Sequence, residues 1–183
     1  MVDIAETRLL LIRHSHAVGQ EPESPLTGPG VAAAKELAEV LSRQPIDAIY
    51  SSPYKRALTT MQPLAAALGR TVKIDRRLQE RRLAATALDD WRAHVLRSYA
   101  DEHYAPEGGE SIAQVRRRAL GALSDIAANK HTLPAICTHG QFISAVLATC
   151  DPNFGYEDWL ALRNPHVIPI TMRGAKITSF RLA

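Results

Sequence analysis

Residues 9–12, an unbroken run of three leucines and an isoleucine followed at once by Arg13 and His14, are the feature that most constrains the fold of this chain. Four consecutive apolar residues are typical of a strand that is buried on both faces, as the strands of parallel sheets are. In open α/β sheets, ligands bind beyond the carboxyl ends of the strands. The run therefore predicts an α/β fold in which a functional site begins at His14.

The chemistry available at this strand end is that of an imidazole beside a guanidinium. A histidine can attack phosphorus, and an arginine can hold phosphoryl oxygens through two parallel hydrogen bonds. The simpler interpretation is a surface turn with incidental basic groups, because an Arg-His pair alone is a weak motif. A second apolar run, residues 134–138, ends at His139 and Gly140. Two histidines at strand ends favour a site over a turn.

Length and composition limit the class of protein. A chain of 183 residues that is 46% hydrophobic can bury a substantial core, and we expect one domain spanning residues 1–183. No stretch approaches the ~20 apolar residues of a membrane-spanning helix, and the first residues do not resemble a secretory signal. We therefore expect a cytoplasmic protein that has no membrane partner.

Cysteine usage and charge point in the same direction. Cys137 and Cys150 lie in apolar surroundings, where they are expected to pack as small apolar side chains rather than to form a disulfide. The net charge of +3 suits anionic ligands. No continuous basic stripe is present, so nucleic acid is not an expected partner.

The remaining elements follow from hydrophobic periodicity and turn residues. Helices are expected after Thr27, after a serine cap and proline at residues 51–53, at about 112–126 and at about 140–150; strands are expected at 47–50, 71–74, 134–138, 167–172 and 176–180. Pro63 should kink or shorten the second helix. Arg56 falls in the first turn of that helix, where a cation opposes the helix dipole unless an anion is bound nearby. A side chain pointing to solvent would explain Arg56 equally simply.

Two further segments are rich in charged or aromatic residues. Residues 84–106 are expected to form a small lid of helix and loop that carries Trp91, Tyr99 and Tyr104. These aromatic side chains suit either stacking on a substrate or packing in the core. The run of three arginines at 116–118 is expected to be mostly solvated surface.

Six short motifs follow one another along nearly the whole chain. They are Arg13-His14-Ser15, Pro25-Leu26-Thr27-Gly28-Pro29-Gly30, Ser52-Pro53-Tyr54-Lys55-Arg56, Leu78-Gln79-Glu80, Gly109-Glu110-Ser111 and His139-Gly140. In this order they resemble the histidine phosphatase superfamily, in its phosphoglycerate mutase-like branch. The resemblance implies a three-layer α/β/α sandwich with a mostly parallel mixed sheet, and a reaction that passes through a phosphohistidine.

The resemblance also implies a role for each site residue. His14 would be the nucleophile, and Glu80 would protonate the leaving oxygen and then activate water. His139 would share in catalysis and in binding phosphate. The residues implied to surround the phosphoryl oxygens are Arg13, Arg56, His139, Thr27 and Gln20. No metal ion or other cofactor is implied, because arginines and histidines supply the positive charge.

Departures from the family pattern bear on the substrate. Ser15 replaces a glycine, Gln20 replaces an asparagine that contacts phosphate in many relatives, and residues 81–83 replace a segment rich in glycine and tryptophan. The chain is also short for a cofactor-dependent mutase. We therefore expect hydrolysis of a small phosphorylated substrate, with inorganic phosphate as product, in preference to mutase-type phosphoryl transfer. A non-catalytic module that binds phosphorylated ligands is the alternative outside enzymes.

A zinc site is a further alternative. His14 and His16 form a His-x-His pair, and Cys137 and His139 form a Cys-x-His pair. Such pairs offer four zinc ligands if the two strand ends adjoin. This interpretation leaves the arginines and the glutamate of the motifs without a role, and the apolar surroundings of Cys137 favour packing.

Overall fold

The computed structural model describes residues 6–182, so residues 1–5 and 183 of the expected single domain lie outside it. Six strands form one sheet in the order β3-β2-β4-β1-β5-β6. Their bounds are β1 Glu6–Arg13, β2 Ala48–Ser51, β3 Val72–Ile74, β4 Pro134–Thr138, β5 His166–Arg173 and β6 Lys176–Phe180. Strand β5 runs antiparallel to both of its neighbours, and the pairs β1–β4, β4–β2 and β2–β3 are parallel. The sheet is mixed and mostly parallel, as expected.

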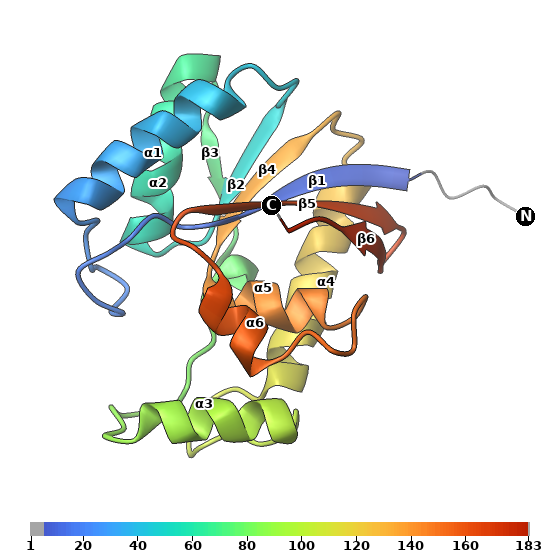
Figure 1. The fold of residues 1–183 in the computed structure, drawn as a ribbon. Helices are drawn as coiled ribbons and strands as arrows, with labels where there is room; N and C mark the ends of the chain where they lie inside the picture. Colours follow the sequence, from blue (N-terminus) through green and yellow to red (C-terminus); the bar gives the residue numbers. More distant parts are fainter. Residues whose placement is uncertain (1–5, 183) are drawn as a thin grey trace, which may run out of the picture.

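Helices cover both faces of this sheet (Figure 1). Helices α1 and α2 lie on one face, and α4 and α5 lie on the other, with α6 and α3 beyond α5 (Figure 1). Their bounds are α1 Gly28–Leu41, α2 Lys55–Leu68, α3 Trp91–Ala100, α4 Ile112–Ala128, α5 Gly140–Leu147 and α6 Tyr156–Ala161, with a 3-10 turn η1 at Arg76–Leu78. The expected three-layer α/β/α sandwich is confirmed.

Strand β1 contributes side chains to the apolar clusters on both faces of the sheet, which explains its unbroken apolar run. Leu9 and Leu11 pack in the larger cluster with α4 and α5, whereas Leu10 and Ile12 pack in the cluster with α1 and α2. Successive side chains of a strand point to opposite faces, so a strand between two helical layers needs an apolar residue at every position.

The start and length of α2 differ from the sequence-based expectation. The helix begins at Lys55 after Tyr54, which makes no side-chain cap, so the prediction of a serine cap followed by proline was wrong. The Ser52 hydroxyl instead accepts from the Tyr54 N–H at 3.3 Å, before the helix begins. The helix also runs past Pro63 to Leu68. Buried side chains beyond the proline, including Leu64, hold the helix against the sheet despite the missing backbone hydrogen bond.

The arginine run at residues 116–118 was wrongly assigned to solvated surface. Arg117 is exposed, but Arg116 pairs with Glu102 at 2.6 Å and Arg118 pairs with Glu110 at 2.8 Å. Successive residues of a helix are rotated by about 100°, so three consecutive arginines leave α4 in three directions. The two outer members therefore reach different neighbours on either side of the helix.

Two expectations about the whole chain can be compared with the fold. Cys137 and Cys150 are both free thiols, as expected. Among residues 6–182, no helix is both long and apolar enough to cross a membrane. Residues 84–106 contain α3 and its flanking loops. That this segment acts as a lid remains a prediction.

Candidate active site

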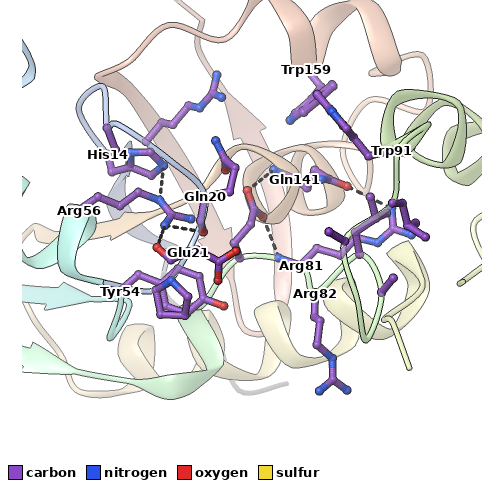
Figure 2. Close-up of a pocket in the computed structure, with 18 of the residues that line it drawn as sticks. His14, Gln20, Glu21, Tyr54, Arg56, Arg81, Arg82, Trp91, Gln141 and Trp159 are labelled. Atoms are coloured by element: carbon purple, nitrogen blue, oxygen red, sulfur yellow. Dashed lines mark hydrogen bonds between the residues drawn. The ribbon is translucent and has the colours of Figure 1, made fainter. Parts of the chain in front are cut away.

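A cavity of about 740 Å³ opens next to the carboxyl end of β1, and Figure 2 shows the side chains that line it. Among the residues expected from the sequence, Arg13, His14, Gln20, Arg56 and Glu80 all line this cavity. They come from the β1–α1 region, the start of α2 and the segment after β3, which are far apart in the sequence. The fold therefore brings most of the expected site together.

His14 is held with its Nε2 atom toward Arg56. The Nδ1 atom lies 2.7 Å from the Ser15 carbonyl oxygen, which can only accept, so Nδ1 carries the proton in the neutral ring. Arg56 donates its Nε–H to Nε2 at 3.1 Å. Burial, together with the nearby charges of Arg56 and Arg13, lowers the pKa of His14 to about 3 against the opposing effect of the Ser15 carbonyl. At neutral pH the imidazole is uncharged, with a lone pair on Nε2.

The lowered pKa of His14 has a consequence for stability. In the unfolded chain His14 titrates near its ordinary pKa of 6.5, whereas in the folded chain it titrates near 3. Between these values the unfolded state binds more protons, so stability is lost as the pH falls through this window, by up to ~1.4 kcal/mol per pH unit. Burial lowers the pKa of His139 as well, which acts in the same direction.

We therefore expect the free energy of unfolding to fall as the pH is lowered from 6.5 toward 3. His14→Asn, which keeps a polar side chain but cannot titrate, should show a shallower pH dependence. Denaturant unfolding curves across this pH range measure both proteins. Identical slopes for the two would contradict the proposed environment of His14.

Arg56 is a buried cation whose side chain turns toward the cavity rather than to solvent. Its Nη1 atom donates to the carbonyl oxygens of Gln20 and Glu21, each at 2.9 Å. Within residues 6–182, no carboxylate forms an ion pair with it. Burial lowers its pKa, and the nearby Glu80 opposes this shift. A buried guanidinium without an ion-pair partner suits the binding of an anion.

Gln20 contributes its backbone rather than its amide to this arrangement. Its carbonyl oxygen accepts from Arg56, while its side chain is exposed at the cavity wall. The amide of Gln20 therefore remains available to turn toward a ligand in the cavity.

Arg13 lies beside Gly140, the first residue of α5. Its Nη1 atom donates to the Leu162 carbonyl oxygen, while its buried Nε has no hydrogen-bond partner within residues 6–182. A Cβ atom on Gly140 would lie 3.2 Å from the Arg13 guanidinium and 2.8 Å from Nε1 of Trp159. Glycine is required here because two side chains pack directly against its Cα.

His139 meets His14 as expected, because β1 and β4 are adjacent and parallel. The His14 N–H donates to the Thr138 carbonyl oxygen at 3.1 Å, and the two imidazole centroids are 5.1 Å apart. His139 is fully buried, with Nε2 2.7 Å from the Ser52 hydroxyl and no partner for Nδ1 within residues 6–182. Burial holds the pKa of His139 well below its usual value.

Glu80 places its carboxylate at the start of α5. Oε1 accepts from the backbone N–H groups of Arg81 at 2.8 Å and Phe142 at 3.2 Å, and Oε2 accepts from that of Gln141 at 3.3 Å. The first N–H groups of a helix lack partners within the helix, so they are available to hold the Glu80 side chain in place. The cavity thus contains one acid group fixed by backbone donors.

Arg118 is a residue of this site that the sequence did not reveal. Its guanidinium donates to the carbonyl oxygens of Gln79 at 2.8 Å and Glu80 at 3.2 Å, while it pairs with Glu110. It thereby holds the backbone that carries the Glu80 carboxylate. The only signal in the sequence is the glutamate of the Gly-Glu-Ser motif, whose partner the motif does not identify.

Thr27 lies apart from the other expected phosphate-binding residues. Its hydroxyl accepts from the Gly30 N–H at 3.0 Å and so caps α1, as the sequence predicted for the start of that helix. The same hydroxyl contacts the His16 carbonyl oxygen at 3.3 Å. Thr27 is not among the residues that line the cavity.

The aromatic residues of the 84–106 segment have different surroundings: Trp91 borders the cavity, Tyr99 packs against the core, and Tyr104 contacts His94 within the segment. Trp91 lines the cavity and is partly exposed. The hydroxyl of Tyr99 donates to Ser144 at 2.8 Å, and that of Tyr104 lies 2.5 Å from Nδ1 of His94. Of these tyrosines neither lines the cavity.

The four ligands of the alternative zinc site do not come together. Cys137 packs among apolar side chains between the sheet and α1 and α2, and burial raises its thiol pKa. His16 is exposed, with Nδ1 3.3 Å from the Thr27 hydroxyl. Within residues 6–182, no group of three or more His, Cys, Asp or Glu side chains is placed to hold a metal ion.

Comparison with known proteins finds a family and several relatives. Residues 9–179 match the family described as the histidine phosphatase superfamily (branch 1). The chain is 31% identical over 136 residues to phosphoserine phosphatase 1 of Hydrogenobacter thermophilus, covering 65% of this chain and 64% of that protein. It is 32% identical over 170 residues to glucosyl-3-phosphoglycerate phosphatase of Mycolicibacterium vanbaalenii, covering 77% and 72%.

A solved structure shares the fold along nearly the whole chain. It is a mycobacterial glucosyl-3-phosphoglycerate phosphatase in complex with inorganic phosphate, with a TM-score of 0.78 and 26% sequence identity over 97% of this chain and 95% of that one.

Proposed function

Because the chain belongs to branch 1 of the histidine phosphatase superfamily and is a phosphatase of that family, we propose that it hydrolyses small phosphomonoesters through a phosphohistidine on His14. One observation carries this proposal. The unprotonated Nε2 of His14 lies at the edge of a cavity among guanidinium groups that form no ion pair within residues 6–182. A neutral nucleophile in a cationic site suits attack on a phosphate ester.

In the first step, Nε2 of His14 would form a bond to phosphorus while the bond from phosphorus to the ester oxygen breaks. The Nε–H of Arg56, which now donates a hydrogen bond to Nε2, would instead donate it to a phosphoryl oxygen, and Arg56 would keep its proton. The unpartnered Nε–H of Arg13 and a ring nitrogen of His139 supply further donors. Glu80 in its acid form would give its proton to the departing oxygen.

In the second step, water would attack the phosphohistidine. Glu80, now a carboxylate, would take a proton from that water, and inorganic phosphate would leave with His14 restored to its neutral form. Guanidinium and imidazole groups would supply the stabilisation that a metal ion provides in other phosphatases.

The substrate is proposed to be a small phosphorylated metabolite. Two of the relatives are named for action on phosphoserine and on glucosyl-3-phosphoglycerate, both of which are phosphomonoesters of small alcohols. The cavity volume of about 740 Å³ lies in the range that takes a drug-sized molecule. The natural substrate can therefore be larger than phosphoserine.

The experiment that tests this function measures inorganic phosphate released from a panel of phosphorylated metabolites, with and without EDTA. Turnover should persist in EDTA, and vanadate should inhibit it. Quenching with a phosphorus-labelled substrate should trap label on His14 that is stable to alkali and labile to acid. Interconversion of phosphoglycerates without phosphate release would instead indicate a mutase, and binding without any turnover would indicate a binding module.

The acid role of Glu80 predicts how its replacement depends on the leaving group. With Glu80→Gln, formation of the phosphoenzyme from an alkyl phosphate should slow by about 10²-fold or more, because the alkoxide needs a proton. Formation from 4-nitrophenyl phosphate should slow far less, since nitrophenolate leaves unprotonated. Rapid-quench measurement of the first turnover isolates this step from hydrolysis of the phosphoenzyme.

Glu21→Gln provides the matched control, because Glu21 is another carboxylate that lines the cavity. It should show no difference between leaving groups. Equal slowing of both esters in Glu80→Gln would rule out proton donation by Glu80.

A further inference from the structure

Arg81 is a cavity residue to which the proposed reaction gives no role. Its side chain lies deep in the protein, with 4% of the residue exposed, although it borders the cavity. Its Nε donates to the Glu110 carbonyl oxygen at 2.7 Å, and its Nη1 donates to Oε1 of Gln141 at 3.1 Å. Within residues 6–182, its Nη2 has no hydrogen-bond partner and no carboxylate forms an ion pair with it. Arg81 is therefore a buried cation with one unused donor.

Trp159 of α6 also has a buried hydrogen-bond donor without a partner in the described part of the chain, but its side chain is uncharged. The residue is 9% exposed and lines the same cavity, yet its indole Nε1–H has no partner within residues 6–182. Nε1 lies against Gly140, and Gln141, the next residue, binds Arg81. Both unused donors thus adjoin the first turn of α5. Buried donors without partners are rare, and each one calls for an explanation.

The position of these donors relative to the nucleophile decides what they can contact. Figure 2 shows His14 and Arg56 on one side of the cavity and Arg81 and Trp159 toward the other. Glu80 binds the backbone of Gln141 and so lies between the two sides. A phosphoryl group on His14 with its ester oxygen at Glu80 therefore directs the alcohol portion of the substrate toward Arg81.

We propose that Arg81 Nη2 and Trp159 Nε1 form a second subsite, which selects phosphomonoesters whose alcohol portion carries a carboxylate. This inference rests on the proposed phosphatase function. A carboxylate has one negative charge and two oxygens, which suits one guanidinium N–H together with one neutral N–H. Binding of a substrate carboxylate would also neutralise the buried charge of Arg81. No carboxylate within residues 6–182 forms an ion pair with this side chain. Arg81 and Trp159 are thus specificity-determining residues.

The test compares pairs of esters that differ in the carboxylate. Phosphoserine is compared with phosphoethanolamine, and 3-phosphoglycerate with glycerol 3-phosphate, by kcat/KM for phosphate release. The wild-type protein should favour the carboxylate member of each pair by about 30-fold, the effect of one charge-assisted hydrogen bond. Arg81→Gln should lose this preference, and Trp159→Phe, which removes the N–H and keeps a smaller aromatic ring, should lose about 5-fold of it. Turnover of the carboxylate-free esters should change little.

Arg82→Gln is the matched control, because Arg82 is the exposed neighbour that borders the same cavity. A loss of preference in Arg82→Gln alone would assign the carboxylate to the cavity rim and overturn the proposal. Equal kcat/KM within each pair for the wild-type protein would also overturn it, while leaving the phosphatase function intact. The conservative Trp159→Phe variant keeps the test decisive if Arg81→Gln does not fold.

Binding separates failure of this subsite from failure of the proposed function. Calorimetry with the His14→Ala variant measures the affinity for 3-phosphoglycerate and for glycerol 3-phosphate without turnover. Tighter binding of 3-phosphoglycerate, lost in the His14→Ala/Arg81→Gln double variant, supports the subsite even if no ester is hydrolysed by the wild-type protein. Equal affinities would overturn the subsite whatever the activity.

Discussion

Replacement of His14 by alanine is expected to lower kcat for phosphate release by about 10⁴-fold or more, because removing the nucleophile of a covalent mechanism leaves only binding and electrostatic stabilisation. The fold should persist. His14 follows the end of β1, and its ring contacts the polar side chains of Arg56 and His139 rather than either apolar core. Phosphate release under single-turnover conditions measures the chemistry, and circular dichroism with a thermal melt checks the fold.

His16→Ala is the control for this variant, since His16 is an exposed histidine that lines the same cavity. It should retain nearly full activity. Labelled phosphate should accumulate on the wild-type and His16→Ala proteins but not on His14→Ala. A His14→Ala protein that still turns over and still becomes phosphorylated would place the phosphohistidine elsewhere and remove the basis of the mechanism.

Arg56→Ala is expected to lower kcat by about 10²- to 10³-fold, the effect of losing one preorganised donor to the charge that develops in the transition state. A second effect should accompany it. The charge of Arg56 helps to lower the pKa of His14, so its removal should move the acid limb of the kcat/KM profile to higher pH. Steady-state rates across pH 3 to 7 measure both changes.

Two control variants separate the possible causes of the Arg56→Ala result. Arg56→Lys tests whether charge alone is sufficient, and Arg70→Ala tests the effect of removing an arginine outside the site. Lysine retains the charge but not the fork that reaches His14 and two carbonyl groups, so Arg56→Lys should remain slow while keeping the acid limb near its wild-type position. Arg70 is an exposed arginine just beyond α2, and its replacement should have little effect. An Arg56→Ala protein with unchanged kcat would show that this guanidinium does not act on the phosphoryl group.

The meeting of His14 and His139 was predictable because it depends on strand ends. Each histidine follows an unbroken apolar strand, and the carboxyl ends of parallel strands lie at the same edge of a sheet. The pairing of Arg13 with Thr138 in neighbouring strands brings the next residue of each strand to the same level. That β1 and β4 are neighbours could not be predicted from their composition, because both strands are equally apolar.

The surroundings of Glu80 were much less predictable. Arg81 and Arg118 belong to charged runs, and a run of charges does not identify which member is buried or which carbonyl oxygen it reaches. Arg81 acquires its partners from Glu110 and from Gln141 of α5, and Arg118 reaches the carbonyl oxygen of Gln79, so these contacts join segments that are far apart in the sequence. The start of α2 was predicted wrongly for a similar reason. The Ser52 hydroxyl contacts His139, a residue far away in the sequence, and does not cap the helix.

The hydrogen bond from Arg56 to His14 gives the resting protein a masked nucleophile. The lone pair that would attack is already occupied, and only a ligand rich in oxygens competes for the guanidinium and frees it. Alkylating reagents that carry no anionic oxygens, such as iodoacetamide, do not displace this hydrogen bond, so the lone pair of Nε2 stays occupied. The same contact that positions the imidazole thus protects it from electrophiles other than its substrate.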